Sequence, residues 1–306
     1  MTIERGYQMN EEILYLNGRF QALSEGRIHV EDRGFQLGDG VYEVIKVMNG
    51  TIIWLEDHLV RLKRSLEAIR LGGALADHPL ETVLPQLVRR AGLVDGSIYV
   101  QVTRGLAPRE FIFPQPPHPT VLAYTRPKQF PDADEIFRGV ALHPVRDQRW
   151  GRCDIKSTNL LAPVLAKEEA WEAGAQEALF ISPRGLVREG GSSNVLAVID
   201  GVIRTHPLNN RILGGITRKH VLRLARGLGF AVDERAFTLR DITGGSAACS
   251  ELFTASTTKD ILPVVRIGDS VVGFGRPGPV TMAIVEAMRE EQAVLAGMQP
   301  EALPDW

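Results

Sequence analysis

The sequence predicts a two-domain protein that mixes helices and strands, of the α+β or α/β class. Its 306 residues are the length of about two domains, and 44% hydrophobic with 24% charged residues is a globular composition. Segments that alternate at period two are interleaved with segments at helical spacing. The stretch 126–134 is rich in proline and charge, so we place the linker there. This divides the chain into a small domain at 1–125 and a large domain at 135–306.

The small domain is expected to begin with strands joined by tight turns. Asn17-Gly18 and Asn49-Gly50 each lie between β-favouring residues, as two-residue hairpin turns require. The other elements expected here are helices at 55–71 and 80–91 and strands at 97–104 and 119–124. The loop 105–119 between those strands is too rich in proline for regular structure. Loops of that length are usually functional or disordered.

The large domain is expected to alternate strands with helices. Asp200-Gly201 indicates another hairpin, and Gly214-Gly215 precedes a helix. The strands expected are 140–145, 177–182, 193–199, 202–205, 251–254 and 262–267, and the helices are 160–171, 216–228 and one from 279 onward. The last residues, 299–306, are expected to fray.

Charge and cysteine usage exclude several classes of partner. A formal net charge of -2 gives no basic footprint for nucleic acid or an anionic membrane. Cys153 and Cys249 lie far apart without a CxxC motif, so neither a metal site nor a disulfide is indicated, which fits a reducing cytoplasm. No apolar run approaches the roughly 18 residues that a membrane span needs. We therefore expect a soluble cytoplasmic protein.

Lys156 is the candidate nucleophile. It lies in RWGRCDIKSTNLL, where an expected strand gives way to an amphipathic helix, with Ser157, Thr158 and Asn159 as candidate helix caps. A lysine amine becomes nucleophilic when burial or a neighbouring positive charge lowers its pKa, and a Schiff base with pyridoxal phosphate is a common use. Most single lysines are surface residues without such a role, so other features must decide.

Other segments offer what pyridoxal phosphate would need. Its pyridine nitrogen needs an acid partner, and Glu189 in the Gly- and Ser-rich turn VREGGSSNV is the candidate, although a solvated turn residue fits that turn equally well. Its phosphate needs N–H groups at a helix N-terminus, and LGGITRKH places Ile216 and Thr217 in a first turn. TASTTKD adds the hydroxyls of Ser256 and Thr257. Each segment alone is weak evidence for a phosphate site, because two glycines before a helix often form an ordinary connection without a ligand.

The segment 273–278 matches the GxGxxG spacing of a dinucleotide-binding turn. That fingerprint requires a following helix, a second strand and an acidic residue about 20 positions further on. Here the chain is nearly finished, and Pro277 stiffens the turn. We therefore do not expect a nicotinamide cofactor.

Seven blocks taken together strongly resemble the fold-type IV pyridoxal-phosphate enzymes, the class IV aminotransferases. They are EDRGFQLGDGVYEVIKV (31–47), HLVRL (58–62), VTRG followed by PR (102–109), RCDIKSTNLL (152–161), EGGSSNV (189–195), LGGITR (213–218) and STT before a Pro-Val strand (256–265). The blocks run in order from about residue 12 to about residue 285. Within the family the likeness is greatest to D-amino acid transaminases.

The resemblance implies a homodimer with the active site shared across the interface. Each subunit would have an N-terminal α+β domain, a C-terminal β-barrel-like domain flanked by helices, and the cofactor between them. It implies that Lys156 bonds pyridoxal 5'-phosphate and moves the substrate proton, and that Glu189 pairs with the pyridine nitrogen. The cofactor-binding residues implied are Arg61, Lys156, Glu189, Leu213, Ile216, Thr217, Ser256 and Thr257. No metal is implied.

The substrate-binding residues implied are Phe35, Tyr42, Arg109 and Phe111. In D-amino acid transaminases the α-carboxylate is held by a tyrosine, an arginine and a histidine two residues after that arginine, the last two from the partner subunit. Tyr42 and Arg109 match, but Phe111 stands where the histidine would be. Because Arg109 retains a strong carboxylate ligand, we expect ping-pong transfer of the amino group from D-amino acids to a 2-oxo acid, 2-oxoglutarate or pyruvate. A solvated loop charge is the other reading of Arg109.

Phe111 leaves an alternative activity open. A more apolar site suits an (R)-selective amine transaminase, in which no carboxylate needs to be recognised. Branched-chain L-amino acid transaminases and aminodeoxychorismate lyase are similar in fold but match the blocks less well.

Overall fold

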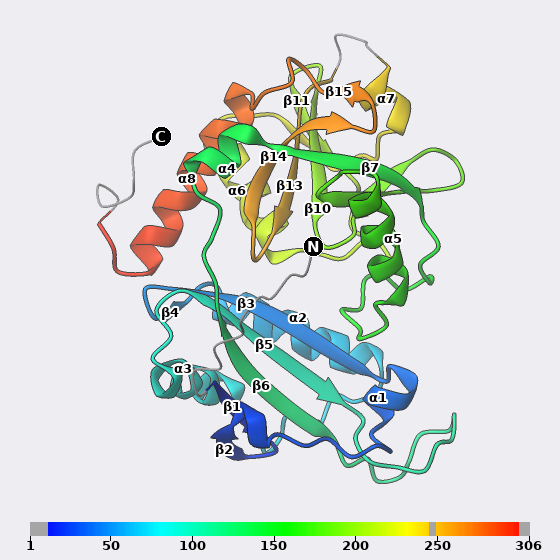
Figure 1. Ribbon diagram of the computed structural model, residues 1–306, viewed down its shortest axis with the longest axis vertical. Helices are drawn as coiled ribbons and strands as arrows, with labels where there is room; N and C mark the ends of the chain where they lie inside the picture. Colours follow the sequence, from blue (N-terminus) through cyan, green and yellow to red (C-terminus); the bar gives the residue numbers. More distant parts are fainter. Residues whose placement is uncertain (1–11, 245–248, 300–306) are drawn as a thin grey trace, which may run out of the picture. The chain divides into compact units, whose positions relative to one another are not determined.

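A computed structural model describes residues 12–244 and 249–299 of the chain. Its contacts divide the chain into two compact units, Met1–Lys128 (unit 1) and Gln129–Trp306 (unit 2) (Figure 1). The division falls inside the stretch 126–134. The first residues of that stretch end a strand and its last residues begin a helix, so the irregular connection is shorter than the composition suggests. The expected fraying at 299–306 falls, after Gln299, outside the described residues.

Unit 1 is built on a six-stranded antiparallel sheet with the order β2-β1-β6-β5-β3-β4. Its strands are β1 (Ile13–Leu16), β2 (Arg19–Ala22), β3 (Gly40–Met48), β4 (Thr51–Ile52), β5 (Gly96–Thr103) and β6 (Thr120–Pro127). Asn17-Gly18 and Asn49-Gly50 form the two predicted hairpin turns. All four residues have positive φ, as the favoured two-residue turns require.

The helices of unit 1 are η1 (Leu23–Glu25), α1 (Arg33–Leu37), α2 (Leu55–Ala68) and α3 (Leu80–Ala91). The two long helices occur where leucine spacing predicts them. Helix α2 packs against β3, and helix α3 packs against β1 and β6 (Figure 1). The short helix α1 interrupts the expected run of strands. Asp32 caps it by accepting the Gly34 N–H at 2.8 Å, and Gly38 ends it at φ 64.

Unit 2 contains a nine-stranded mixed sheet with the order β12-β11-β10-β13-β14-β7-β8-β9, and β15 pairs with β14. Its strands are β7 (Val140–Arg146), β8 (Glu177–Ile181), β9 (Val187–Gly190), β10 (Asn194–Ile199), β11 (Val202–Thr205), β12 (Val232–Asp233), β13 (Cys249–Ser256), β14 (Asp260–Ile267) and β15 (Ser270–Val271). The last strand in this order, β9, also contacts β10. The sheet therefore curls toward a barrel, as the β-barrel-like expectation requires.

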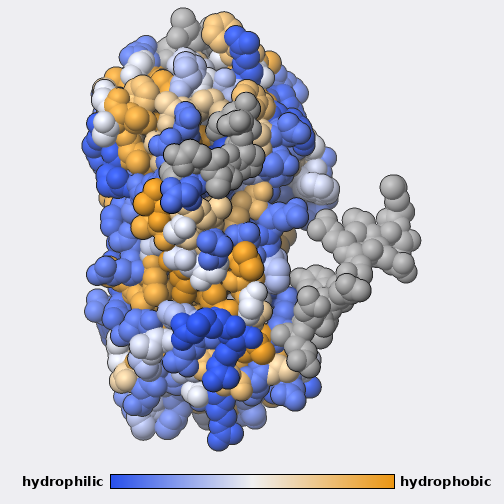
Figure 2. Space-filling view, turned by 90° about the vertical axis from the view of Figure 1, so that its left-hand side faces the viewer, coloured by the Kyte–Doolittle hydropathy of each residue, from blue (hydrophilic) through white to orange (hydrophobic). Residues whose placement is uncertain are grey.

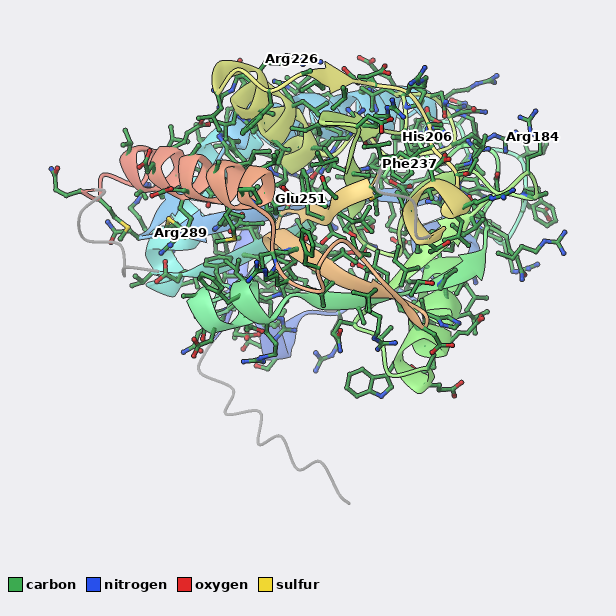
Figure 3. The ribbon with its side chains drawn as sticks, turned by 90° about the horizontal axis from the view of Figure 1, so that it is seen from above. Arg184, His206, Arg226, Phe237, Glu251 and Arg289 are labelled. Carbon is green, nitrogen blue, oxygen red and sulfur yellow. The ribbon has the colours of Figure 1, made fainter. Side chains whose placement is uncertain are left out.

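Five helices accompany this sheet: α4 (Ala133–Arg138), α5 (Leu161–Glu172), α6 (Ile216–Gly227), α7 (Leu239–Thr243) and α8 (Pro279–Leu295). Helix α5 packs on β7 and β8, whereas α6 and α8 pack on β13 and on each other. Glu251 of β13 accepts the N–H groups of Val280 at 3.0 Å and Thr281 at 2.7 Å, and Figure 3 shows it beside the start of α8. A carboxylate on a neighbouring strand thus caps that helix.

The expectation for the start of α5 is wrong. Leu160 is the N-cap residue, in place of Ser157, Thr158 or Asn159, and its own apolar side chain makes no capping hydrogen bond. The helix is also not amphipathic in the expected sense. It buries the small residues Ala166 and Ala170 against the sheet and leaves larger apolar side chains exposed, because the helix must lie close to β7 and β8.

The expectation that Glu189 lies in a turn is also wrong. It lies in the short strand β9, with its side chain buried. Four residues are too few for alternation to reveal a strand, and the glycines and serines that follow obscure its end.

Hydrophilic residues cover much of the face drawn in Figure 2, with hydrophobic residues in smaller areas between them. This distribution is ordinary for a globular protein. No helix among the described residues is long and apolar enough to cross a membrane.

Candidate active site

Lys156 lies in the irregular segment between β7 and α5. It is half-buried between the buried residues Ile155 and Ser157. Two hydrogen bonds attach this segment to the one that leads into α6: the Cys153 N–H donates to the Asn210 carbonyl at 2.9 Å, and the Asn210 side chain donates to the Gly151 carbonyl at 2.8 Å. The lysine segment is therefore anchored to the approach to α6.

Glu189 is held in β9 by donors from three segments. Arg149 bonds its Oε1, the Asn194 amide donates to Oε2 at 3.0 Å, and the Leu213 N–H donates to the same Oε2 at 3.0 Å. Burial raises the pKa of Glu189 to about 7, although Arg149 and the Leu213 N–H favour the ionised form. A carboxyl group with this pKa can share a proton with a ligand nitrogen near neutral pH.

Arg149 and Asn194 are site residues that the sequence reasoning missed. Arg149 forms a two-bond ion pair with Asp147, at 3.0 and 3.1 Å, and its guanidinium lies 4.2 Å from the centre of the Phe180 ring. It is 40 positions from Glu189, so no local pattern connects the two. Asn194 is only five positions after Glu189, and its place in the EGGSSN block was an available signal.

The start of α6 approaches Asn194 closely. A Cβ on Gly215 would lie 2.0 Å from the Asn194 Oδ1, so any larger residue would force the helix start or the asparagine to shift. Ile216 and Thr217 follow in the first turn, and both are buried. Their N–H groups are at the end of the helix that favours an anion.

The end of β13 lies beside the same asparagine. Asn194 pairs with Ala255 across the β10–β13 ladder, and Ser256 and Thr257 follow at the hairpin that leads to β14. Unit 2 therefore brings Glu189, the Leu213 backbone, the start of α6 and the two hydroxyl residues together around Asn194. Leu213 was expected to support a ring face, which stays a prediction. Its backbone N–H donates to Glu189, and its carbonyl accepts from the Asn194 amide.

Arg61 lies on α2 in unit 1 and is buried against β3. Its Nε and Nη2 each donate to Glu43 at 2.7 Å, and the His58 ring nitrogen lies 2.8 Å from the same carboxylate. Burial alone would raise the pKa of Glu43, but Arg61 and His58 lower it to about 2. The guanidinium is thus held in one orientation by a carboxylate that stays ionised.

Tyr42 is the neighbour of Glu43 on β3, so the two side chains point to opposite faces of the sheet. The Tyr42 ring stacks on Tyr99 at 5.7 Å, and Tyr99 lies 5.2 Å from Tyr124. Burial raises the pKa of Tyr99, and its hydroxyl donates to Gln101 at 2.7 Å. The face opposite the helices therefore carries a row of tyrosines.

The remaining expected substrate residues lie on the surface of unit 1. Arg109 and Phe111 belong to the loop between β5 and β6, and the Phe111 side chain is 82% exposed. Phe35 lies on α1 and is 76% exposed. These residues are available to a ligand or another chain.

The residues of unit 2 fit a phosphorylated pyridine. Gly215 lets the start of α6 approach Asn194 closely, and the N–H groups of the first turn of that helix suit an anion. Glu189 is a buried acid suited to a ring nitrogen. Within the described ranges, no group of three or more histidine, cysteine, aspartate or glutamate side chains could hold a metal ion.

Comparisons with known proteins show the family of the chain. The family model for amino-transferase class IV matches residues 40–267. The chain is 42% identical to D-alanine aminotransferase of Bacillus licheniformis, over 89% of this chain and 94% of that protein. It is 39% identical to D-alanine aminotransferase of Staphylococcus haemolyticus, over 90% and 96%. The solved branched-chain aminotransferase of the archaeon Thermoproteus uzoniensis, with norvaline, has a TM-score of 0.77 at 27% identity, over 93% of this chain and 95% of that one.

Proposed function

Because the chain belongs to the class IV aminotransferase family, we propose that it is a pyridoxal-phosphate-dependent transaminase that transfers the amino group of a D-amino acid to a 2-oxo acid, 2-oxoglutarate or pyruvate. The observation that carries the choice of D-amino acids is the 42% identity to a D-alanine aminotransferase over most of both chains. The branched-chain structure is less similar in sequence, at 27% identity, and supports the fold and the family more than the substrate.

The chain's own residues divide the work of holding the cofactor. Lys156 would hold it covalently, Glu189 would bond its ring nitrogen, and Leu213 would support the ring. The phosphate would take the N–H groups of Ile216 and Thr217, the hydroxyls of Ser256 and Thr257, and the guanidinium of Arg61. When bound, the cofactor supplies an electron sink for charge at the substrate's α-carbon.

Proton transfer is the task of Lys156. Once the substrate is bound, the amine of Lys156 removes the proton from the substrate's α-carbon. The same amine then returns that proton to another atom of the reacting system. Glu189 keeps a proton at the ring nitrogen, which its pKa of about 7 allows near neutral pH. Arg149 holds Glu189 in place and is itself held by Asp147.

Substrate recognition is proposed for unit 1 residues. Arg109 offers a guanidinium fork and Tyr42 a hydroxyl, which together suit an α-carboxylate. We further propose a homodimer in which the loop that carries Arg109 serves the partner's active site. The exposure of large apolar side chains on that loop, at Phe111 and Ile112, supports an interface there.

An (R)-selective amine transaminase is the second candidate. The observation that favours it is Phe111, an exposed aromatic ring two residues after Arg109, where a histidine would help to hold a carboxylate. An apolar ring there would favour a substrate without a second polar group.

A half-reaction on the yellow holoenzyme distinguishes these candidates. D-alanine, D-glutamate, L-leucine and (R)-phenylethylamine are added separately without an acceptor, and the loss of the visible cofactor absorption is followed. We expect rapid loss with the D-amino acids. Loss mainly with the amine would establish the second candidate, and loss mainly with L-leucine would contradict both.

A further inference from the structure

The loop between β5 and β6 is long (Figure 1). Two buried arginines, Arg33 and Arg104, contact it. Arg33 and Arg104 are each only 2% exposed, and neither belongs to the site described above. Both bond the same carboxylate: the Nε atoms of the two arginines each donate to Asp39 Oδ2 at 2.8 Å, and Arg104 Nη2 donates to Oδ1 at 3.0 Å. Asp39 therefore fixes the two guanidiniums side by side.

The remaining donors of these arginines reach the backbone of the loop and of the segment after α2. Arg33 Nη1 donates to the Glu110 carbonyl and, at 3.5 Å, to the Ile112 carbonyl. Arg104 Nη2 donates to the Ile69 carbonyl at 2.7 Å. Its guanidinium also lies 3.6 Å from the centre of the Phe113 ring, a close cation–π contact.

The base of the loop is closed by a second acidic residue. Asp32 accepts the Thr103 hydroxyl at 3.0 Å and the Thr120 hydroxyl at 2.7 Å, which joins the end of β5 to the start of β6. Asp32 therefore fixes where the loop leaves and re-enters the sheet. The stretch 109–113, further along the loop, is contacted by the arginines instead.

We infer that Arg33 and Arg104 are positioning residues for substrate recognition: through the Glu110 and Ile112 carbonyls and the Phe113 ring, they set the path of the segment that presents Arg109 and Phe111. This inference rests on the proposed function, in which Arg109 binds the α-carboxylate. Arg109 directly precedes a bonded carbonyl, and Phe111 lies between two of them. We call these contacts of Arg33 and Arg104 with the loop the clamp. Loss of the clamp would thus displace the side chains of both Arg109 and Phe111.

A lysine in place of Arg33 could not make all of these contacts. Its planar guanidinium serves a carboxylate through one edge and two carbonyls through the other, whereas a lysine ammonium is a single point charge. Arg33→Lys should keep the ion pair with Asp39 and lose the carbonyl bonds. Phe113→Leu should keep apolar bulk at a residue that is partly exposed, and remove the ring under Arg104.

The test uses the holoenzyme and two readouts. The first is the rate of tryptic cleavage after Arg109, followed by mass spectrometry under native conditions. The second is the KM and kcat for D-alanine with 2-oxoglutarate as acceptor. For Arg33→Lys and Phe113→Leu we expect cleavage after Arg109 to accelerate and the KM for D-alanine to rise about tenfold, with kcat within about a factor of two.

Two further variants control for general damage. Arg27→Lys changes an exposed arginine of unit 1 outside the clamp and should leave both readouts at wild-type values. Phe113→Tyr keeps the ring under Arg104 and should restore slow cleavage and the normal KM. Unchanged cleavage after Arg109 in both clamp variants would overturn the inference, as would a fall in kcat that matches the rise in KM. If the wild type does not react with D-amino acids, the proposed function fails, while the cleavage rates still decide whether the arginines hold the loop.

Discussion

Lys156 is the residue whose loss should remove the chemistry with least damage to the fold. Its side chain is only half-buried, so Lys156→Ala deletes little packing, but it removes the amine proposed to hold the cofactor and move the proton. We expect transamination to fall below detection while the melting temperature of the cofactor-free protein is retained. Lys63→Ala, which changes an exposed lysine of α2, is the matched control and should keep full activity. Near-normal rates in Lys156→Ala would contradict the assignment.

The same residue shows what could be predicted from the sequence of the site. Lys156, Glu189 and the start of α6 lie in short blocks whose residue types carry their chemistry locally. Arg149, the partner that orients Glu189, lies in no such block with it. The two residues are 40 positions apart, and they meet because the curled sheet of unit 2 brings β9 close to the segment after β7. The same holds for Arg33 and Arg104, whose link through Asp39 depends on the tertiary fold.

At the scale of single elements, the start of α6 offers a sharp test of the phosphate cradle. Gly215→Ala would place a Cβ 2.0 Å from Asn194 Oδ1, so the first turn or the asparagine must shift. We expect weaker retention of pyridoxal phosphate, measured as the half-saturating concentration when cofactor-free protein is reloaded. Gly227→Ala lies on the same helix and meets no atom within 4 Å, so it should bind cofactor normally. Equal affinities in the two variants would rule out the start of α6 as the cradle.

The contact between α2 and β3 should make stability depend on acid. The pKa of Glu43 is lowered to about 2 from an ordinary 4.5, so its contribution to stability is present above pH 4.5 and is lost as the pH falls through about 2. Glu43→Gln leaves the buried Arg61 without its carboxylate and should cost about 3 to 5 kcal/mol at neutral pH. The free energy of unfolding, measured by denaturant titration from neutral pH down to the pKa of Glu43, should fall less steeply with acid in the variant. Parallel pH profiles would contradict this account.

Local signals also explain which elements were predicted. The hairpins at Asn17 and Asn49 and the helices α2 and α3 have strong signals within their own residues, in turn chemistry or leucine spacing. Among the elements that were missed, α1, α4, α7 and β9 have four to six residues, too few for a period to appear. Helix α5 was predicted, but its start was misjudged because capping residues in the sequence need not adopt the cap conformation.

At the scale of the whole molecule, the proposed homodimer predicts that each complete active site needs residues from two chains. In the proposed homodimer, Lys156 of one chain works with Arg109 of the other. The Lys156→Ala dimer then lacks the amine in both sites, and the Arg109→Ala dimer lacks the carboxylate ligand in both. Both variants should have low transamination rates at low D-alanine concentration. In Arg109→Ala the loss should come chiefly from a raised KM.

Mixing these two variants tests the arrangement directly. If subunits are exchanged by reversible unfolding of an equal mixture, about half of the dimers are hybrids, and each hybrid contains one site with both Lys156 and Arg109. Activity at low D-alanine should therefore recover to about one quarter of the wild-type value, in proportion to the hybrid fraction measured by native mass spectrometry. If Lys156 and Arg109 serve the same site from one chain, hybrids gain no complete site, and the mixture stays at the average of its parents.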